Sequence, residues 1–254
     1  MTAQTCHHPT TTLGVDIGGS GIKAAIVCGQ CGRLVGRRSL APTPQPATPA
    51  AVAAVVATAV ATHDWSGPIG LTFPGLIRHG VAILGVNLDP AWRGCDVAAL
   101  LPSGKVTVLN DADAAGLAEV RFGAARGVSG VVIVLTFGSG IGSALFVNGR
   151  LIPNTELGHL ELGGRDVQEL AAGSAKTKHQ LSFEQWAGRV QRYLEYLDAL
   201  FSPNLFVLGG GISQDHDRWM PYLHLGTPVK PAEMRNNAGI VGAAIAAIDA
   251  AGTH

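Results

Sequence analysis

The residues best suited to chemistry begin with an acid at the end of an apolar strand. Asp16 lies within the alternating stretch 13–17 and is followed at once by a glycine turn. Glycines let the backbone take positive φ and let an anion approach main-chain N–H groups. A carboxylate beside bound phosphates can hold Mg²⁺, often through water. We therefore expect Asp16 to be a magnesium ligand and the turn to bind phosphate; a plain glycine hairpin is the alternative. The expected phosphate-binding residues are Gly18, Gly19, Ser20, Gly21 and Lys23.

Two further glycine runs follow apolar strands. The strand 131–136 leads into Gly138, Ser139 and Gly140, and the chain then returns in a second strand over 143–147. The strand 205–208 leads into Gly209, Gly210 and Gly211. We expect the first run to hold phosphates and the second to lie close to a nucleotide or polyanion. A tight helix entry is the alternative for the second.

Polar residues also stand where strands end. Asn110 and Asp111 lie between a β-branched strand at 106–109 and a stretch of helical composition at 114–122, and Gly75 lies in the turn 73–75 that ends the strand 68–73. Ligands of α/β folds bind at the carboxyl ends of strands. Helix capping is the alternative for the Asn-Asp pair.

The polar loop 154–164 contains Glu156 and His159, and Glu169 follows in a short helix predicted over 166–172. Carboxylates and imidazole suit vicinal hydroxyl groups, which present donors and acceptors in turn. A metal site at Glu156 and His159 is the alternative.

These residues require a frame of hairpins and helices. The strands on either side of the first glycine turn alternate with a period of two, which predicts a hairpin, and the second turn has the same surroundings. Two such hairpins, each starting one half, predict a duplicated α/β architecture with a cleft between the halves. Helices are predicted over 49–62 with Thr48 as N-cap, over 182–200 with a capping box, and over 238–250, where Gly239 and Gly242 allow close packing.

Composition limits the classes of protein that this chain can be. Hydrophobic residues make up 47% and charged residues 14% of the 254 residues, which excludes a disordered chain. The net charge is zero, so no long-range attraction for nucleic acid or an anionic membrane is expected. No apolar run reaches the length of a membrane span, and the start has no signal-peptide pattern, so we expect a cytoplasmic protein. The CxxC at Cys28 and Cys31 is interpreted as a turn with two thiols.

The ordered motifs resemble the ROK family of sugar kinases and repressors, within the hexokinase–actin–Hsp70 superfamily, and most closely its polyphosphate glucokinase branch. The matching segments are LGVDIGGSGIK, FPG, NDADAAGLAE, TFGSGIGSALF, NTELGHLEL, SPNLFVLGGGIS and RNNAGIVGAA. The resemblance implies a hexokinase/actin-like (ribonuclease H-like) duplicated fold with two α/β domains. We place a disordered tail at 1–12, a small domain at 13–109 completed by the helix 238–250, and a large domain at 110–237.

The resemblance also implies roles for individual residues. Asp111 corresponds to the catalytic base and Asn110 to a sugar ligand. Many relatives have a cysteine cluster for structural zinc after the 154–164 loop, whereas 163–173 contains no cysteine, so no zinc site is expected. The expected sugar-binding residues are Gly75, Asn87, Asn110, Asp111, Glu156, His159 and Glu169.

The activity implied by the resemblance is phosphorylation of glucose, and of mannose, on the 6-hydroxyl, with Mg²⁺ and with inorganic polyphosphate or ATP as donor. A homodimer is implied as well. A polyphosphate chain needs local cations along its path, for which Lys176, Lys178 and Arg121 are candidates, surface solubility charges being the alternative. The other functional hypotheses are a sugar-responsive repressor and a pure actin- or chaperone-like ATPase.

Overall fold

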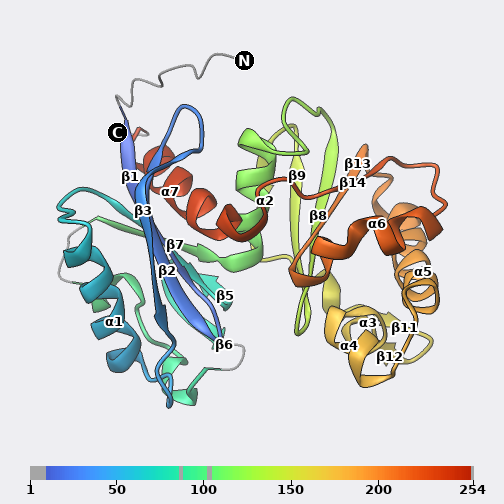
Figure 1. Cartoon of the computed structure of the whole chain (residues 1–254), viewed down its shortest axis with the longest axis horizontal. Helices are drawn as coiled ribbons and strands as arrows, with labels where there is room; N and C mark the ends of the chain where they lie inside the picture. The colour runs from blue at the N-terminus through green and yellow to red at the C-terminus, as the bar shows by residue number, and fades with distance from the viewer. Residues whose placement is uncertain (1–9, 86–87, 102–104, 253–254) are drawn as a thin grey trace. The chain divides into compact units, whose positions relative to one another are not determined.

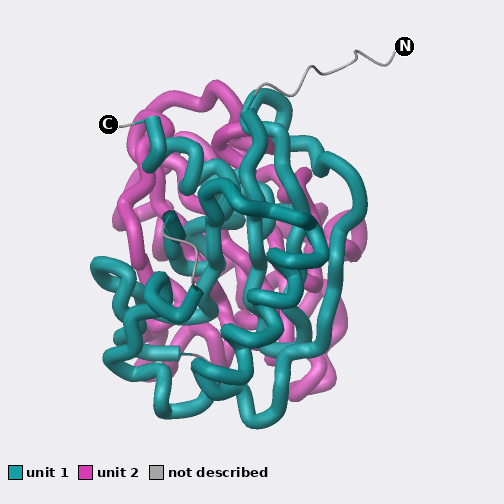
Figure 2. The backbone as a smooth tube through the Cα atoms, turned by 90° about the vertical axis from the view of Figure 1, so that its left-hand side faces the viewer, with its two compact units in different colours: residues 1–118, 236–254 teal, residues 119–235 magenta. Residues whose placement is uncertain are grey.

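The computed structural model describes residues 10–85, 88–101 and 105–252. The chain forms two compact units (Figure 2): unit 1 comprises 1–118 and 236–254, and unit 2 comprises 119–235. The division falls inside helix α2 (Asp111–Phe122), and helix α7 (Ala238–Ala251) returns to unit 1. Residues 11 and 12, which we expected in the N-terminal tail, begin the first strand instead.

Unit 1 is built on a five-stranded sheet with the order β3-β2-β1-β4-β7. Strands β1 to β3 form an antiparallel meander, while β4 and β7 add parallel to β1. The register pairs Ile17 with Ile22 across the first glycine turn, which confirms the predicted hairpin. The strands are β1 (Thr11–Ile17), β2 (Gly21–Cys28), β3 (Leu34–Pro42), β4 (Ile69–Phe73) and β7 (Val106–Asn110).

Unit 2 repeats this topology with the order β10-β9-β8-β13-β14. Again the first three strands are antiparallel and the last two are parallel to the first. Phe137 pairs with Ile141 across the second glycine turn, so the second predicted hairpin is confirmed. The strands are β8 (Val131–Phe137), β9 (Ile141–Val147), β10 (Arg150–Ile152), β13 (Leu205–Gly209) and β14 (Val229–Pro231). The duplication predicted from the two hairpins is therefore present.

Helices cover both faces of the unit 1 sheet (Figure 1). Val15 and Ile17 of β1 share a core with Val52 and Val56 of helix α1 (Pro49–Thr62). The intervening Gly14 faces α7, because a Cβ there would lie 2.0 Å from the carbonyl oxygen of Ile240. Successive strand residues point to opposite faces, so α1 and α7 lie on opposite sides of β1.

Helix α5 (Phe183–Phe201) supplies most of the core of unit 2 and begins as predicted. The Ser182 side chain accepts from the backbone of Gln185, and the Gln185 side chain accepts in return, which forms a capping box. The apolar stripe of α5 is fully buried against β8 and β13. Trp186 also donates a hydrogen bond to the carbonyls of Ala171 and Ala172. The remaining helices of unit 2 are α3 (Val167–Ala171), α4 (Gly173–Lys178) and α6 (His216–Trp219).

Short hairpins are the main difference from the expected structure. Gly75, predicted as a turn residue, begins β5 (Gly75–Arg78), which pairs with β6 (Val81–Gly85), and the loop 154–164 contains β11 (Glu161–Leu162), paired with β12 (Arg165–Asp166). Strands of two to five residues are too short to show a clear period. The 3₁₀ segments are Pro90–Trp92, Ala98–Leu100, Leu157–His159, Gly211–Asp215, Met220–Tyr222 and Arg235–Asn237.

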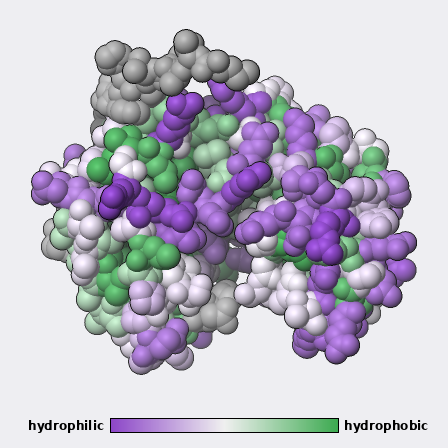
Figure 3. All heavy atoms as spheres, in the orientation of Figure 1, coloured by the Kyte–Doolittle hydropathy of each residue, from purple (hydrophilic) through white to green (hydrophobic). Residues whose placement is uncertain are grey.

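Within the described part of the chain, no helix combines the length and apolar character needed to cross a membrane. On the face drawn in Figure 3, hydrophilic and hydrophobic residues are interspersed.

Candidate functional site

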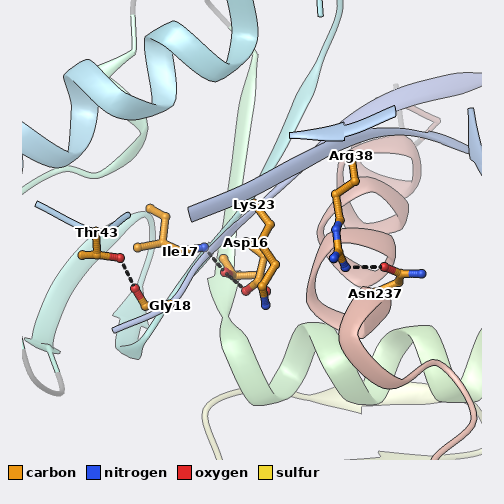
Figure 4. Close-up of polar contacts among 8 residues, drawn as sticks. Asp16, Ile17, Gly18, Lys23, Arg38, Thr43 and Asn237 are labelled. Atoms are coloured by element: carbon orange, nitrogen blue, oxygen red, sulfur yellow. Dashed lines mark hydrogen bonds and ion pairs between the residues drawn. The ribbon is translucent and has the colours of Figure 1, made fainter. Parts of the chain in front are cut away.

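In unit 1, Asp16 is held in a fixed position near the end of β1 (Figure 4). Its Oδ2 lies 3.1 Å from the ammonium of Lys23, and its Oδ1 accepts a hydrogen bond of 3.0 Å from the Thr72 hydroxyl. The Thr72 hydroxyl oxygen in turn accepts from the Ile17 N–H at 2.9 Å. Helix α7 closes one side, since a Cβ on Gly239 would come within 2.7 Å of the Asp16 carboxylate carbon.

These contacts leave the Asp16 carboxylate able to hold a hydrated magnesium ion. A carboxylate has about four acceptor sites, and Lys23 and Thr72 occupy two of them. Mg²⁺ commonly keeps several waters and needs only one or two protein carboxylates besides the phosphates of its ligand. The donor set therefore fits the expected ion. No group of three or more His, Cys, Asp or Glu side chains that could hold a metal occurs among the residues described.

The first glycine turn is held by hydrogen bonds to its backbone, while its central residues are exposed to solvent. The Gly18 N–H donates to the Gly21 carbonyl at 3.0 Å, and the Thr43 hydroxyl donates to the Gly18 carbonyl at 2.6 Å (Figure 4). Gly19 and Ser20 are exposed, and a Cβ on Gly19 would meet no atom within 4 Å. Neither packing nor a positive φ requires glycine at position 19. Access for an anion to the backbone does account for it.

Asn110 and Asp111 form the corner between β7 and α2. The Asn110 Oδ1 accepts from the N–H groups of Ala112 and Asp113 at 2.8 and 3.0 Å, and its Nδ2 donates to the Gly75 carbonyl at 3.0 Å. Helix capping, the alternative for this pair, is thus what Asn110 does. Asp111 follows as the first residue of α2 and is exposed, with its Oδ1 accepting from the Ala112 N–H at 2.9 Å.

Gly75 is fixed by its surroundings as well as by Asn110. Its φ is +151°, and a Cβ would lie 2.0 Å from the Leu84 carbonyl oxygen, so only glycine fits. Asn87, another expected sugar ligand, lies outside the described residues.

In unit 2, the second glycine turn borders a pocket of about 430 Å³. Gly138 and Ser139 line it together with Lys176 of α4, Phe183 of α5 and Asp215. The turn resembles the first one but is one residue shorter, because the Gly138 N–H donates to the Gly140 carbonyl at 3.0 Å, whereas Gly18 donates to Gly21. A Cβ on Gly138 would again meet no atom within 4 Å.

Ser174 connects this turn to α4: its hydroxyl donates to the Ser139 carbonyl at 2.7 Å, and its N–H donates to the Gly138 carbonyl at 2.9 Å.

The glycines of the third run, unlike those of the first two, are explained by packing. Gly209 is the buried end of β13, and Gly210, with φ +86°, lies so close to Phe137 that a Cβ would be 2.4 Å from its backbone. The exposed Gly211 opens a 3₁₀ segment, as a helix entry would.

The sugar candidates of unit 2 lie around a short polar network. The His159 Nδ1 is 2.9 Å from Asp166 Oδ2 and 3.1 Å from Gln168 Nε2. A protonated Nδ1 would donate to Asp166 Oδ2 and leave Nε2 as an acceptor, whereas an unprotonated Nδ1 would accept from the Gln168 amide nitrogen. Glu169 is exposed in the first turn of α3.

Glu156 is the carboxylate of this group that lies deepest. Its residue is half-buried, and the loss of solvation raises the pKa of its carboxyl, while nearby His159 lowers it by a smaller amount. Buried carboxyl groups with raised pKa values are more frequent at functional sites than elsewhere.

Sequence reasoning missed the residues that orient the candidates, namely Thr72, Asp166, Gln168 and Ser174. Thr72 had a signal, because it is a hydroxyl inside an otherwise apolar strand directly before the FPG segment. The others lie in short elements with no period. In unit 1 the structure brings Asp16 and Lys23 into contact, and in unit 2 it places His159 one backbone hydrogen bond from Glu156.

The chain is similar to known proteins in sequence and in structure. A polyphosphate glucokinase of Mycobacterium tuberculosis is 50% identical over 240 residues, covering 93% of this chain and 91% of that protein. The crystal structure of an inorganic polyphosphate/ATP-glucomannokinase from Arthrobacter sp. strain KM has a TM-score of 0.88 and 47% identity, covering 96% of this chain and 100% of the other.

A ROK hexokinase from Thermus thermophilus has a TM-score of 0.77 and 27% identity, covering 96% of this chain and 100% of the other. These likenesses confirm the expected hexokinase/actin-like fold. Residues 12–174 match the ROK family. With more than half of its length matched and a relative at 50% identity, the chain belongs to the ROK family.

Proposed function

We propose that this chain is a glucokinase that transfers a phosphoryl group from inorganic polyphosphate or ATP to the 6-hydroxyl of glucose. The observation that carries this proposal is the corner at the end of β7. There both ends of the Asn110 side-chain amide form hydrogen bonds with the backbone, while Asp111 is exposed. The names of the relatives at 47–50% identity support the same activity.

Asp111 serves as the general base in this proposal. Phosphoryl transfer to a sugar requires an acceptor for the hydroxyl proton, and most of the remaining rate comes from positioning and charge neutralisation. The position of Asp111 at the N-terminus of α2 favours its ionised form, which is the form that accepts a proton.

Sugar recognition is assigned to exposed and half-buried polar groups. Glu156, His159 and Glu169 present carboxylates and an imidazole to vicinal hydroxyls. The contribution of Asn110 is partly indirect, because its hydrogen bonds hold Gly75 and the start of α2 in place. Asn87 is retained as a sugar ligand on the resemblance alone.

Donor phosphates are assigned to the open glycine turns, Gly18, Gly19, Ser20 and Gly21 with Lys23, and Gly138, Ser139 and Gly140, with Gly209, Gly210 and Gly211 near a nucleotide. Asp16 would hold Mg²⁺ through water, and the ion would neutralise the donor phosphates. Mannose as a second substrate, a homodimer and a cytoplasmic location complete the proposal. The repressor alternative is not favoured, because the relatives at 47–50% identity are kinases by name.

A coupled assay of glucose 6-phosphate formation tests the proposal. The purified chain should phosphorylate glucose in the presence of Mg²⁺ with long-chain polyphosphate and with ATP, and activity should disappear with EDTA. Absence of product with both donors would contradict the kinase assignment, while product with ATP alone would restrict the donor.

A further inference from the structure

The pocket beside the second glycine turn contains a cluster of charged groups whose arrangement the transfer reaction itself does not explain. The Lys176 ammonium lies 4.2 Å from the centre of the Phe183 ring, and the Arg218 guanidinium carbon lies 4.2 Å from the same centre. Lys176 and Phe183 line the pocket, whereas Arg218 contacts the Phe183 ring and is not a lining residue. One aromatic side chain therefore contacts two cations, of which Lys176 lines the pocket and Arg218 lies beside the lining residues Phe183 and Asp215.

The ring fixes these cations without neutralising them. An aromatic face attracts a cation through its quadrupole but accepts no proton and carries no net charge. Among the described residues, no carboxylate forms an ion pair with Lys176. In the described part of the chain, the carboxylate paired with Arg218 is Asp215, at 3.5 Å, and the two side chains are 65% and 48% exposed. Lys176, Arg218 and Asp215 together therefore carry a net charge of +1 at and beside the pocket.

The chain as a whole has zero net charge, so this excess is a local feature. Gly138 and Ser139, whose carbonyl accepts a hydrogen bond from Ser174, line the same pocket as Lys176. If the terminal phosphate groups of a long polyanion bind at the second glycine turn, the phosphate groups that follow them can reach Lys176 and Arg218. Asp215 also faces this space and would repel such an anion unless Arg218 screens it.

We propose that Lys176 and Arg218, held by Phe183, form a cationic clamp that binds the part of an inorganic polyphosphate chain beyond the phosphate being transferred. This inference rests on the proposed function, because it assigns the path of one of the two donors. Of the cations suggested by the sequence, Lys176 lines the pocket, whereas Lys178 and Arg121 are not among its lining residues.

Measurements of polyphosphate binding test the clamp independently of phosphoryl transfer. The affinity for long-chain polyphosphate should be measured at several salt concentrations for the wild type, Lys176→Met, Arg218→Met and the double variant. Each phosphate contact that a cation neutralises adds about 0.7 to the slope of log K against log salt for a single-stranded polyanion. We expect each single variant to lower the slope by about that amount and the double variant by about twice as much.

Arg192→Met is the matched control, since Arg192 is an exposed cation on α5, the helix of Phe183, and does not line the pocket. It removes the same charge and should leave the slope unchanged. Phe183→Leu provides a second test, because it keeps both charges and removes only the ring. It should weaken polyphosphate binding more than ATP binding, with the fold checked by thermal unfolding.

If Lys176→Met and Arg192→Met change the slope equally, the clamp is wrong while the kinase activity can still stand. If the wild type neither binds nor uses polyphosphate, the donor assignment and the clamp both fail.

Discussion

Asn110 fixes the corner between β7 and α2 with both ends of its side-chain amide. Its amide oxygen caps α2 and its amide nitrogen holds the carbonyl of Gly75, so both ends are used by the backbone. The sequence predicted a polar corner here, and it left capping and ligand binding open as alternatives. The structure shows that Asn110 caps α2 and that Asp111 is the exposed carboxylate of the corner, while the role of Asn110 as a sugar ligand stays a prediction.

We expect Asp111→Asn to lower kcat by roughly 10²- to 10⁴-fold, the contribution of a general base, while glucose binding persists. The amide keeps an oxygen at the position that accepts from the Ala112 N–H, so the helix start should survive. Asp217→Asn, at a side chain that is 90% exposed, is the control. Steady-state kinetics and glucose titration measure both effects, and near-normal kcat in Asp111→Asn would remove the residue from the mechanism.

Glu156 allows a prediction from pH. Burial raises the pKa of the Glu156 carboxyl in the folded chain. At pH values between the unfolded-state pKa and the folded-state pKa, the folded chain therefore binds more protons at this carboxyl than the unfolded chain does. The free energy of unfolding therefore falls as the pH rises through this window. Glu156→Gln removes that loss, so the variant should be more stable than the wild type at about pH 7, and the difference should vanish near pH 4.

The same substitution should raise the KM for glucose, because the carboxylate is assigned to the sugar. Thermal unfolding across pH and glucose kinetics are the two measurements, with the exposed Glu161→Gln as the control. A gain in stability with unchanged KM would identify Glu156 as a structural carboxyl only.

At the scale of elements, regular periodicity made the long segments predictable. The two glycine hairpins, α1 with its Thr48 cap and α5 with its capping box appear as expected. The hairpin of β5 and β6 was missed because it depends on Gly75 approaching the Leu84 carbonyl, a tertiary contact that no local pattern encodes. The network of His159 with Asp166 was missed for the same reason, since it forms across the short β11–β12 hairpin.

The packing of α7 against α2 depends on one glycine of the predicted pair. A Cβ on Gly242 would lie 1.7 Å from the Ala114 carbonyl oxygen, a contact with backbone that cannot rotate away. We expect Gly242→Ala to destabilise the protein by about 3 kcal/mol or more. Gly188→Ala in α5 is the opposite control, because its Cβ would meet no atom within 4 Å and alanine favours a helix by about 1 kcal/mol.

Urea unfolding of the two variants measures this difference directly. Equal stability of Gly242→Ala and the wild type would mean that α7 can move away from α2, and the close approach would then not define the helix position.

At the scale of the whole molecule, duplication was readable from the sequence because each half begins with the same hairpin and glycine turn. The two sheets have the same strand order, and in each turn the N–H of the first glycine donates to the carbonyl of the last, Gly18 to Gly21 and Gly138 to Gly140. Absence of net charge means that a charged donor is recognised by local groups and not by a long-range field. In the proposed function, the two donors are therefore distinguished by the local groups of the glycine turns and of the pocket.

Both donors must present a terminal phosphoryl group to the same sugar hydroxyl, and a single base is assigned to the reaction. We therefore expect ATP to inhibit the polyphosphate-dependent reaction competitively, with an inhibition constant equal to its own KM where KM reflects dissociation. Adenosine, which has no phosphates, should compete far less well. Added salt should weaken the use of polyphosphate more steeply than the use of ATP, because more phosphate charges are screened. Initial rates with both donors at saturation give the decisive measurement. If the donors share one site, the rate with both present lies between the rates with each donor alone. A rate equal to the sum of the two would require separate donor sites.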